Sequence, residues 1–383
     1  MPSRYAELGV DVKKKGIESL KAQTQNLFPE AFCAVQRDPE STDMGIVAHS
    51  DSAGSKPIQS YLHWKETSNP RWFKGLAQDV VAMNLDDIIC VGARPISFLD
   101  YVALNPRKVD KESLLRSLAE GFRECFSTLE HYGLRMLFSG GETADLPDQV
   151  RTFDISGSIF GRVDLQNVII GDRVAEGDIV LGLRSGGKMS YERQENSGIM
   201  CNGLTLARLS LMDRKYHEKY PELGEVNGER FQGRFKFDEY LDDLDMTVGE
   251  AILSPTRLYA PVIGKILEAC GIEVHGMVHN TGGGLTKCLR IGRGIRYVKD
   301  SLPATDPVFL LIQKETGIAW KEMYEDFNMG IGFELYLDPD AVEKVLSIAD
   351  SFRLGAQVIG RCERNPAGSV LIIKSSFGDY KYS

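Results

Sequence analysis

Hydrophobic positions in the first half of the chain follow helix spacing and strand spacing in turn. Residues 75–91 are predicted to form a helix, because apolar side chains such as Val80 and Met83 recur at helical intervals. A second amphipathic helix is predicted over residues 111–132, with Gly133 as its C-cap. The predicted strands are residues 45–49, 96–104, 134–138 and 153–160. This alternation indicates an α/β domain.

The second half repeats the same style after a turn-rich stretch at residues 171–178. A strand is predicted at residues 179–183, and helices are predicted at 255–270 and 340–351. Two α/β domains of similar size follow from this pattern, residues 1–170 and residues 171–383. The fold class is therefore α/β (α+β).

Two stretches of the second half have the character of insertions. One is residues 184–196, and the other is residues 213–240, which is dense in charged side chains. A run of charges is usually a solvated surface, so the second stretch is interpreted as a surface excursion.

Composition places the chain among globular proteins and excludes several functions. Of its 383 residues, 43% are hydrophobic and 26% are charged, which excludes a disordered, collagen-like or coiled-coil protein. The net charge of −9 argues against binding to nucleic acid or to an anionic membrane. No apolar stretch reaches the roughly 20 residues that span a bilayer. Nucleotides stay possible ligands, because Mg²⁺ can bridge acidic side chains to phosphates.

The cysteines indicate a reducing compartment. There are seven, and no two have C-x-x-C spacing, so zinc-finger and dithiol sites are not indicated. Residues 1–20 contain no apolar core of a signal peptide. We therefore expect a cytoplasmic protein.

The common phosphate-binding motifs are absent. The Gly-Lys pairs at 187–188 and 264–265 are followed by Met189 and Ile266, so neither completes a Walker A loop. There is no G-x-G-x-x-G and no protein-kinase motif set. If the protein uses ATP, it therefore binds it with a fold other than the P-loop, dinucleotide-binding or protein-kinase folds.

Three aspartates on the predicted helix 75–91 are a candidate cation site. Asp79 and Asp86 are seven residues apart and share one helix face, and Asp87 follows directly. Carboxylate oxygens are the ligands that Mg²⁺ prefers. A solvent-exposed acidic face is an equally good interpretation of this pattern alone.

Glycine-containing loops at predicted strand ends are further candidates. Asp51 precedes Gly54 and Lys56, an arrangement that can hold phosphate and metal, although an ordinary turn explains it as well. The stretch 139–145 (SGGETAD) is interpreted as a second loop of this kind. A third loop follows His279, which is a candidate general acid or base, with three glycines at 282–284 that allow close approach of a ligand.

One more loop, residues 197–203, leads into a predicted helix. Anions are favoured at such a helix start, although a plain helix entry is the alternative. Cys201 in this loop is interpreted as a packed thiol rather than a reactive one.

The order of these motifs along the chain resembles the phosphoribosylformylglycinamidine cyclo-ligase (aminoimidazole ribonucleotide synthetase) family. The matching stretches are YAELGVDV (5–12), AHSDSAGSK (48–56), DVVAMNLDDIICVGARPISFLDY (79–101), GGETADLP (140–147), LSPTRLY (253–259), HNTGGGL (279–285) and FNMGIG (327–332). They cover nearly the whole chain, and the set is specific although each member is not.

The resemblance implies an enzyme with two α/β domains that forms a homodimer through the N-terminal ones. It implies ATP-dependent cyclisation of formylglycinamidine ribonucleotide to aminoimidazole ribonucleotide, with Mg²⁺ as the metal. The residues assigned to catalysis are His279, Asp87 and Lys56. Those assigned to ATP and phosphate are Ser50, Gly54, Lys56, Gly140, Gly141, Thr143, Asn202, Gly282, Gly283 and Gly284. Those assigned to metal are Asp51, Asp79, Asp86, Asp87 and Glu142.

The chain also departs from the family pattern. Met200 stands where the family has histidine, and Ser52 replaces a glycine of the first loop. Two alternatives are therefore kept. One is a related ATP-dependent kinase or synthetase of the same superfamily, and the other is a nucleotide-binding paralogue without catalysis.

Overall fold

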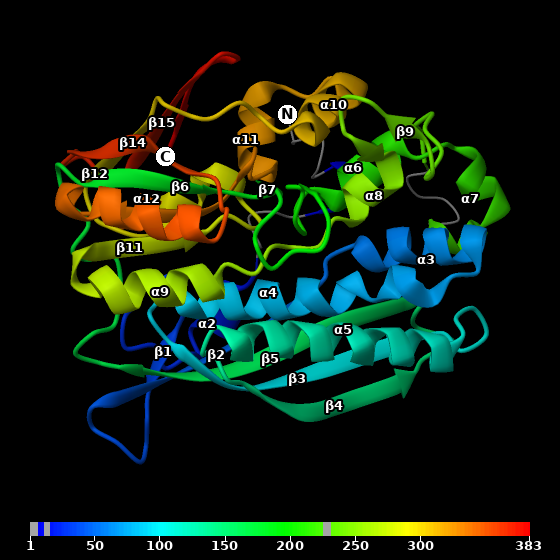
Figure 1. Ribbon diagram of the computed structural model, residues 1–383, viewed down its shortest axis with the longest axis horizontal. Helices are drawn as coiled ribbons and strands as arrows, with labels where there is room; N and C mark the ends of the chain where they lie inside the picture. Colours follow the sequence, from blue (N-terminus) through cyan, green and yellow to red (C-terminus); the bar gives the residue numbers. More distant parts are fainter. Residues whose placement is uncertain (1–6, 11–15, 225–230) are drawn as a thin grey trace.

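Two β-sheets, one from each half of the chain, form the frame of the protein (Figure 1). The computed structural model describes residues 7–10, 16–224 and 231–383. The five-stranded sheet is built from strands that lie between Val35 and Asp164, and the seven-stranded sheet from strands between Ile179 and Tyr382. The change of sheet falls within residues 165–178. The predicted α/β fold class in two parts is confirmed.

The five-stranded sheet has the order β1-β2-β5-β3-β4. Strands β3 and β4 run parallel, and the other neighbouring pairs run antiparallel. Its strands are β1 (Val35–Arg37), β2 (Met44–Ser52), β3 (Arg94–Leu104), β4 (Leu137–Asp145) and β5 (Phe153–Asp164).

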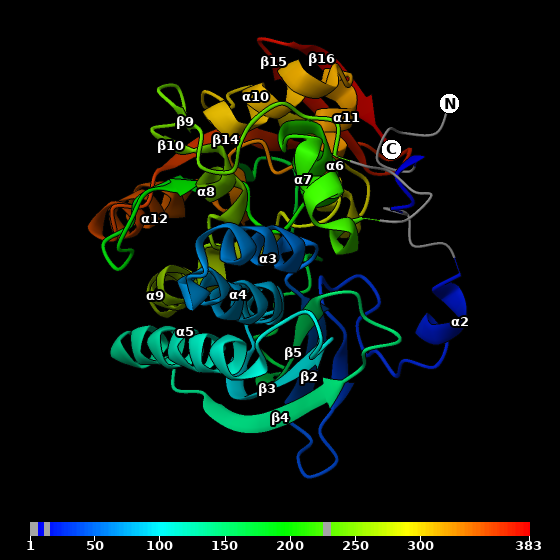
Figure 2. The ribbon, with the colours of Figure 1, turned by 90° about the vertical axis from the view of Figure 1, so that its right-hand side faces the viewer.

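Helices cover one face of this sheet and leave the other open (Figure 2). The covering elements are α3 (Lys56–Thr67), the 3-10 helix η1 (Pro70–Phe73), α4 (Gly75–Ile89) and α5 (Lys111–His131). No described helix lies on the opposite face, and the short α2 (Glu18–Lys21) is placed beside the sheet (Figure 2). Alternation along β5 shows both faces, since Ile159 is buried while Phe160 is 44% exposed.

Helix α4 lies between the two halves of the protein. It packs against α5 on one side and against α9 (Ala260–Cys270) of the second half on the other (Figure 1). All its residues except Gly75 and Gln78 are buried. The alternative of a solvent-exposed acidic face on this helix is therefore wrong.

The seven-stranded sheet has the order β11-β13-β6-β14-β12-β15-β16. Strands β12 and β15 run parallel, and the other neighbours run antiparallel. Its strands are β6 (Ile179–Arg184), β11 (Val274–His279), β12 (Ile295–Lys299), β13 (Ile331–Leu337), β14 (Ala356–Arg364), β15 (Val370–Ser375) and β16 (Gly378–Tyr382).

The helices of the second half form two groups beside this sheet. Helix α9 packs against α12, whereas α10 packs against α6 and α11. Besides α9, the helices are α6 (Leu204–Leu211), α7 (Lys215–Lys219), α8 (Val248–Leu253), α10 (Pro307–Thr316), α11 (Trp320–Asp326), α12 (Val342–Ser351), η2 (Pro221–Leu223), η3 (Gly271–Glu273), η4 (Gly284–Arg290) and η5 (Pro339–Ala341). Among the described residues, no helix combines the length and apolar character needed to cross a membrane.

Two sequence-based predictions need correction. The stretch 139–145, predicted as a loop, belongs to strand β4, because it pairs in parallel with β3. The stretch 213–240 is not a plain surface excursion, since Tyr216, Phe231 and Phe235 are buried in its described part. These apolar side chains attach the charged segment to the core.

The other insertion is also fixed to the body of the protein. Within residues 184–196, the short strand β7 (Gly186–Gly187) pairs with β8 (Asn196–Ser197). A further hairpin, β9 (Tyr240–Leu241) with β10 (Met246–Thr247), leads into α8, where Thr247 forms a capping box with Glu250.

Candidate active site

The last turn of α4 places Asp87 opposite the end of strand β11. The Nδ1 atom of His279 lies 2.8 Å from Asp87 Oδ1, and the imidazole is fully buried. Burial alone raises the pKa of Asp87, but Lys287 and His279 outweigh it and hold that pKa well below its ordinary range. Burial lowers the pKa of His279, and Asp87 opposes that shift without reversing it. An ionised carboxylate therefore accepts a hydrogen bond from Nδ1–H of a neutral imidazole.

This arrangement leaves the second imidazole nitrogen with a lone pair. His279 Nε2 is buried and has no hydrogen-bond partner in the described structure. The ring lies between Tyr259 and Phe333, at centroid distances of 6.1 and 6.0 Å. The Asp87–His279 pair can thus accept a proton at Nε2, as a general base does.

Lys287 is a third member of this site that the sequence analysis missed. It lies on η4, and its Nζ donates to His279 O at 3.1 Å and to Thr281 Oγ1. Burial lowers the pKa of Lys287, and the carboxylates of Asp87 and Asp51 oppose the shift.

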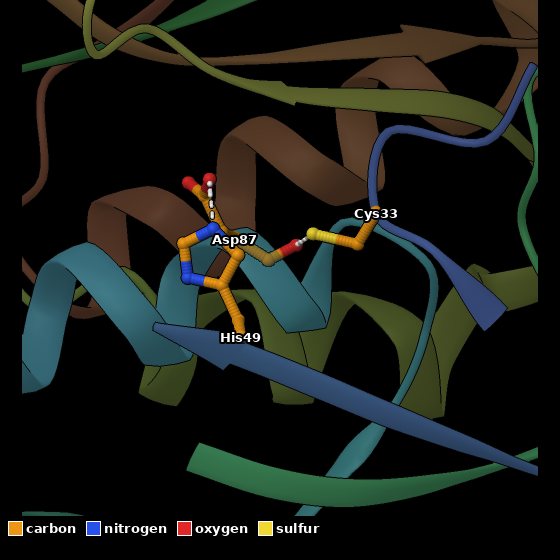
Figure 3. A group of neighbouring side chains, drawn as sticks. All are labelled: Cys33, His49 and Asp87. Carbon is orange, nitrogen blue, oxygen red and sulfur yellow. Dashed lines mark hydrogen bonds and ion pairs between the residues drawn. The ribbon is translucent and has the colours of Figure 1, made fainter. Parts of the chain in front are cut away.

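Strand β2 contributes His49 and Asp51, which alternate onto the same face of the sheet. His49 Nδ1 lies 3.0 Å from Asn84 Oδ1, and its Nε2 lies 3.4 Å from Asp87 Oδ2 (Figure 3). Asn84 Nδ2 donates to Asp51 O at 3.2 Å and to Val80 O at 2.8 Å. Neither His49 nor Asn84 was predicted, although the period of two on β2 places His49 beside Asp51.

The five carboxylates predicted as metal ligands do not converge on one point. In the described part of the chain, Cys33, His49 and Asp87 form the one group of three or more side chains that could share an ion. Asp51 and Asp87 are carboxylates, the ligand type that Mg²⁺ prefers, but Asp51 is not part of this group.

Lys56 and Asp79 form a buried ion pair within the first half, and both also bind residues of the second half. Lys56 Nζ donates to Asp79 Oδ1 and to Ser254 O, both at 2.6 Å, and its side chain has no exposed surface. Asp79 Oδ1 also accepts from the backbone N–H and the hydroxyl of Thr256, each at 2.7 Å. These contacts favour a structural role over contact with phosphate or metal.

Asp86 binds the start of helix α9. Its two oxygens accept the backbone N–H groups of Tyr259 and Ala260, both at 2.9 Å. A carboxylate at this end of a helix satisfies free N–H groups and matches the helix dipole. Because both oxygens are engaged, this side chain also has a structural role, at the boundary between the two halves.

Three loops gather at the boundary of the two halves. An added Cβ at Gly54 would lie 3.0 Å from Cys201 O, so residues 50–56 touch the loop 197–203. Asn202 Nδ2 in turn donates to Asn280 O at 3.3 Å. These contacts bring Gly54 and Asn202 beside the loop that begins at His279.

The three glycines after His279 differ in their surroundings. An added Cβ at Gly284 would lie 2.4 Å from Phe327 O, so this glycine is required for packing. At Gly282 the nearest atom would be Asn202 Oδ1 at 3.9 Å, and at Gly283 it would be Lys287 Cγ at 3.4 Å. Gly282 and Gly283 therefore leave room near the backbone, as a ligand-binding loop requires.

The remaining predicted phosphate and metal ligands lie elsewhere. Ser50 alternates to the open face of the sheet, where its hydroxyl accepts from Ser158 Oγ at 3.0 Å. Glu142 shares this face, because it pairs with Tyr101 in β3. Gly140, Gly141, Glu142 and Thr143 all lie on the edge strand β4.

Register separates these β4 residues from Asp51. A row across the sheet runs from Asp51 through Gly157 and Asp100 to Gly141. Three strand spacings of ~4.8 Å put about 14 Å between the ends of this row. Within one chain, Glu142 is therefore not near the Asp87 cluster.

Met200 and the insertion at 184–196 adjoin the site. Met200 is buried, has φ +58°, and its sulfur would touch a side chain placed at Gly332. Arg257 donates to both oxygens of Glu192, at 2.8 and 2.7 Å, and to the carbonyls of Gly186 and Gly187. The insertion is thus bound to the LSPTRLY segment.

The sequence matches two profiles of one family. The profile described as "AIR synthase related protein, N-terminal domain" matches residues 32–163, and the one described as "AIR synthase related protein, C-terminal domain" matches residues 175–373. A phosphoribosylformylglycinamidine cyclo-ligase of Methanocaldococcus jannaschii is 34% identical over 365 residues, which is 93% of this chain and 91% of that protein. One of Methanothermobacter thermautotrophicus is 33% identical, over 90% of each chain.

Solved structures resemble the fold at lower identity. "AaThiL complexed with AMPPCP and TMP" has a TM-score of 0.54 at 14% identity, covering 96% of both chains. "T. maritima PurL complexed with ATP" has a TM-score of 0.54 at 12% identity, covering 95% of this chain and 47% of that one. Together, the two matching profiles and the relatives that align over nearly the full length establish that this chain belongs to the AIR synthase related family.

Proposed function

We propose that the protein is an ATP-dependent phosphoribosylformylglycinamidine cyclo-ligase that converts formylglycinamidine ribonucleotide to aminoimidazole ribonucleotide, ADP and phosphate. The observation that carries the proposal is the buried Asp87–His279 pair, formed where the two family domains meet. The cyclo-ligases named above support the choice of substrate, because they align over nine-tenths of this chain.

Each residue of the pair has a definite part in the proposed reaction. Ring closure requires a nitrogen nucleophile to lose a proton as it attacks the activated carbon. His279 Nε2 is the free acceptor for this proton, and Asp87 fixes the tautomer and stabilises the imidazolium that forms. Lys287 holds the backbone at His279 and so positions the ring.

ATP and Mg²⁺ are part of the proposal. Relatives of this fold have been solved with ATP and with AMPPCP. Asp51 and Asp87 are the residues that would hold Mg²⁺, which would supply neutralisation of phosphate charge. Gly282 and Gly283, with Asn202 beside them, leave the space in which a phosphate could approach the backbone. Lys56, Asp79 and Asp86 are assigned to holding the two halves together.

Phosphate release with Mg-ATP tests the activity, with and without formylglycinamidine ribonucleotide, while aminoimidazole ribonucleotide is assayed in the same sample. Matched amounts of phosphate and imidazole product are expected. Asp87→Asn and His279→Ala should each abolish turnover while the circular dichroism spectrum stays native. ATP turnover with another acceptor, or binding without turnover, would contradict the proposal.

We also propose a homodimer formed through the open face of the five-stranded sheet. Three large apolar side chains lie on that face: Tyr101, Leu137 and Phe160 are 42%, 57% and 44% exposed. Apolar surface left open in this way marks an interface between proteins. Phe160→Glu should shift the molar mass measured by light scattering to that of a monomer. Ile272→Glu, which charges an apolar residue that is 78% exposed in the other half, should leave the mass unchanged.

We propose further that Gly140, Gly141, Glu142 and Thr143 serve the site of the second subunit. Support comes from their distance from Asp51 within one chain and from their place beside the open face. Mixing inactive Asp87→Asn with inactive Glu142→Gln then leaves one intact site in every mixed dimer. Random exchange of subunits makes half the dimers mixed, so about a quarter of wild-type activity should return. No recovery would place Glu142 and Asp87 in the same chain's site, and full activity of Glu142→Gln alone would remove it from the site.

A cytoplasmic location is proposed from the thiols. All seven cysteines are buried and unpaired in the structure. Unpaired cysteines are typical of a reducing compartment. Non-reducing mass spectrometry of protein isolated from cells should find no disulfide.

A further inference from the structure

A cysteine, a histidine and a carboxylate meet at the edge of the candidate active site (Figure 3). Cys33 lies just before β1, His49 on β2 and Asp87 near the end of α4. Each offers one ligand atom, and the three atoms lie within 4.8 Å of one another. We propose that these residues bind a borderline-soft divalent cation of the zinc class.

The tautomer of His49 is fixed for metal binding. Asn84 Nδ2 donates to two backbone carbonyls, of Asp51 and Val80, so the atom that faces His49 is the amide oxygen. His49 Nδ1 must then carry a hydrogen and donate to Asn84 Oδ1. A neutral ring oriented in this way presents the lone pair of Nε2 toward Asp87, and such outer contacts are typical of histidines that ligate metals.

His49 Nε2 and Asp87 Oδ2 are 3.4 Å apart. A positive charge between the two atoms, either a proton on the ring or a bound metal ion, satisfies both of them. A metal ion therefore takes the place of that proton. Two ligand atoms at ~2.0–2.1 Å from a tetrahedral zinc ion are about 3.3–3.4 Å apart, which matches the observed separation.

Cys33 determines the class of ion. Its Sγ now donates to Asp87 O at 3.1 Å, and the thiol is buried. The thiol uses its proton in this contact, so a bound metal must replace that proton, and binding to the thiol releases it. Nitrogen and sulfur ligands favour zinc, cobalt and related ions over Mg²⁺, which prefers oxygen.

The surroundings of the three ligands allow an ion to enter from solvent, and they also contain positive charges that oppose its binding. His49 is 24% exposed, so an ion can reach the site from solvent on its side. Lys287 and Arg290 lie close enough to lower the pKa of Cys33, and they also repel a dication. Three protein ligands leave a fourth position for water. The site shares Asp87 with the proposed catalytic pair and with the proposed Mg²⁺ ligands, so the two kinds of ion would compete for this carboxylate. The inference does not rest on the proposed function, since it is tested by binding alone.

The experiment is a titration of the full chain, freed of metal by a chelator, with Co²⁺ followed by Zn²⁺. One equivalent of Co²⁺ should bind and give a thiolate-to-cobalt charge-transfer band, release at least one proton and be displaced by Zn²⁺ in the presence of excess Mg²⁺. Cys33→Ser should lose the band. His49→Gln should weaken binding by about 10–100-fold or more.

Cys125→Ser is the matched control, since it changes another buried thiol, on α5, outside this group. It should bind Co²⁺ as the wild type does. A missing charge-transfer band in the wild type, or a band that persists in Cys33→Ser, would overturn the proposal. Because His49 is partly exposed, its variant tests the site even if Cys33→Ser does not fold. Turnover is not measured, so failure here and failure of the cyclo-ligase proposal are distinguishable.

Discussion

Replacing Asp86 with alanine tests whether this carboxylate holds the two halves together. In the native protein both oxygens accept backbone N–H groups at 2.9 Å, from Tyr259 and Ala260 at the start of α9. The alanine variant leaves both donors buried, because Ala260 and Tyr259 have no exposed surface. The expected result is a large loss of stability.

The magnitude follows from the two abandoned donors. A buried donor left without a partner costs ~1–3 kcal/mol, so two cost roughly 2–6 kcal/mol. Part of this loss is offset, because burial disfavours the charged form of Asp86 and raises its pKa, and alanine removes that charge. We expect the free energy of unfolding to fall by about 2–4 kcal/mol.

Asparagine does not rescue the variant fully. Its single oxygen replaces one acceptor, but its NH₂ group then faces the second backbone N–H. We therefore expect Asp86→Asn to lose about 1–3 kcal/mol.

Urea denaturation followed by circular dichroism measures both variants. Asp350→Ala on the exposed side of α12 is the control, and it should stay within about 0.5 kcal/mol of the wild type. A loss below about 1 kcal/mol in Asp86→Ala would refute the assignment of Asp86 to a structural contact. Asp86 would then be available again as a metal ligand.

Three further predictions concern buried groups. Burial and the nearby Glu322 and Glu325 raise the pKa of Asp326 from 3.8 to about 7. The stability that the protonated carboxyl contributes is therefore present below pH 4 and is lost as pH rises through 7. Asp326→Asn cannot ionise, and by urea titration it should gain up to about 4 kcal/mol on the wild type between pH 4 and 8. Glu192→Ala takes one carboxylate from the buried guanidinium that it pairs with, so we expect a loss of about 2–3 kcal/mol and faster proteolysis within residues 185–196. Burial lowers the pKa of His63 to about 3, so the wild type should lose stability as pH falls from 6.5 to 3, and His63→Leu should not show this loss.

The spacing of Asp79 and Asp86 predicted their common helix face, but not their partners. Both bind backbone N–H groups about 175 residues further along the chain, which α9 and the segment before it bring to α4, and Asp79 also binds Lys56 and the Thr256 hydroxyl. Backbone N–H groups occur at almost every residue and cannot be recognised in a sequence. Aspartates that bind such groups therefore show the same sequence pattern as aspartates that bind a metal ion. The family resemblance assigned Asp86 to metal, and the helix-face pattern made Asp79 a candidate as well.

For strand β4, the local sequence favoured the wrong type of element. Two adjacent glycines before Glu142 are typical of a loop, but they belong to an edge strand because they pair with β3.

The cluster around Asp87 was only partly predictable. Asp87 and His279 were each predicted as site residues, but their pairing was not. His49 and Lys287 were missed because each contributes a single polar side chain to a mainly apolar segment.

The two carboxylates that α4 directs toward the second half are anchor points about 10 Å apart, seven residues at ~1.5 Å each. One anchor would leave a pivot, but two on a rigid helix fix an orientation. We therefore expect the two halves to move as one body rather than to close about a hinge. Substrate and product would then exchange through movement of the loops that rim the site.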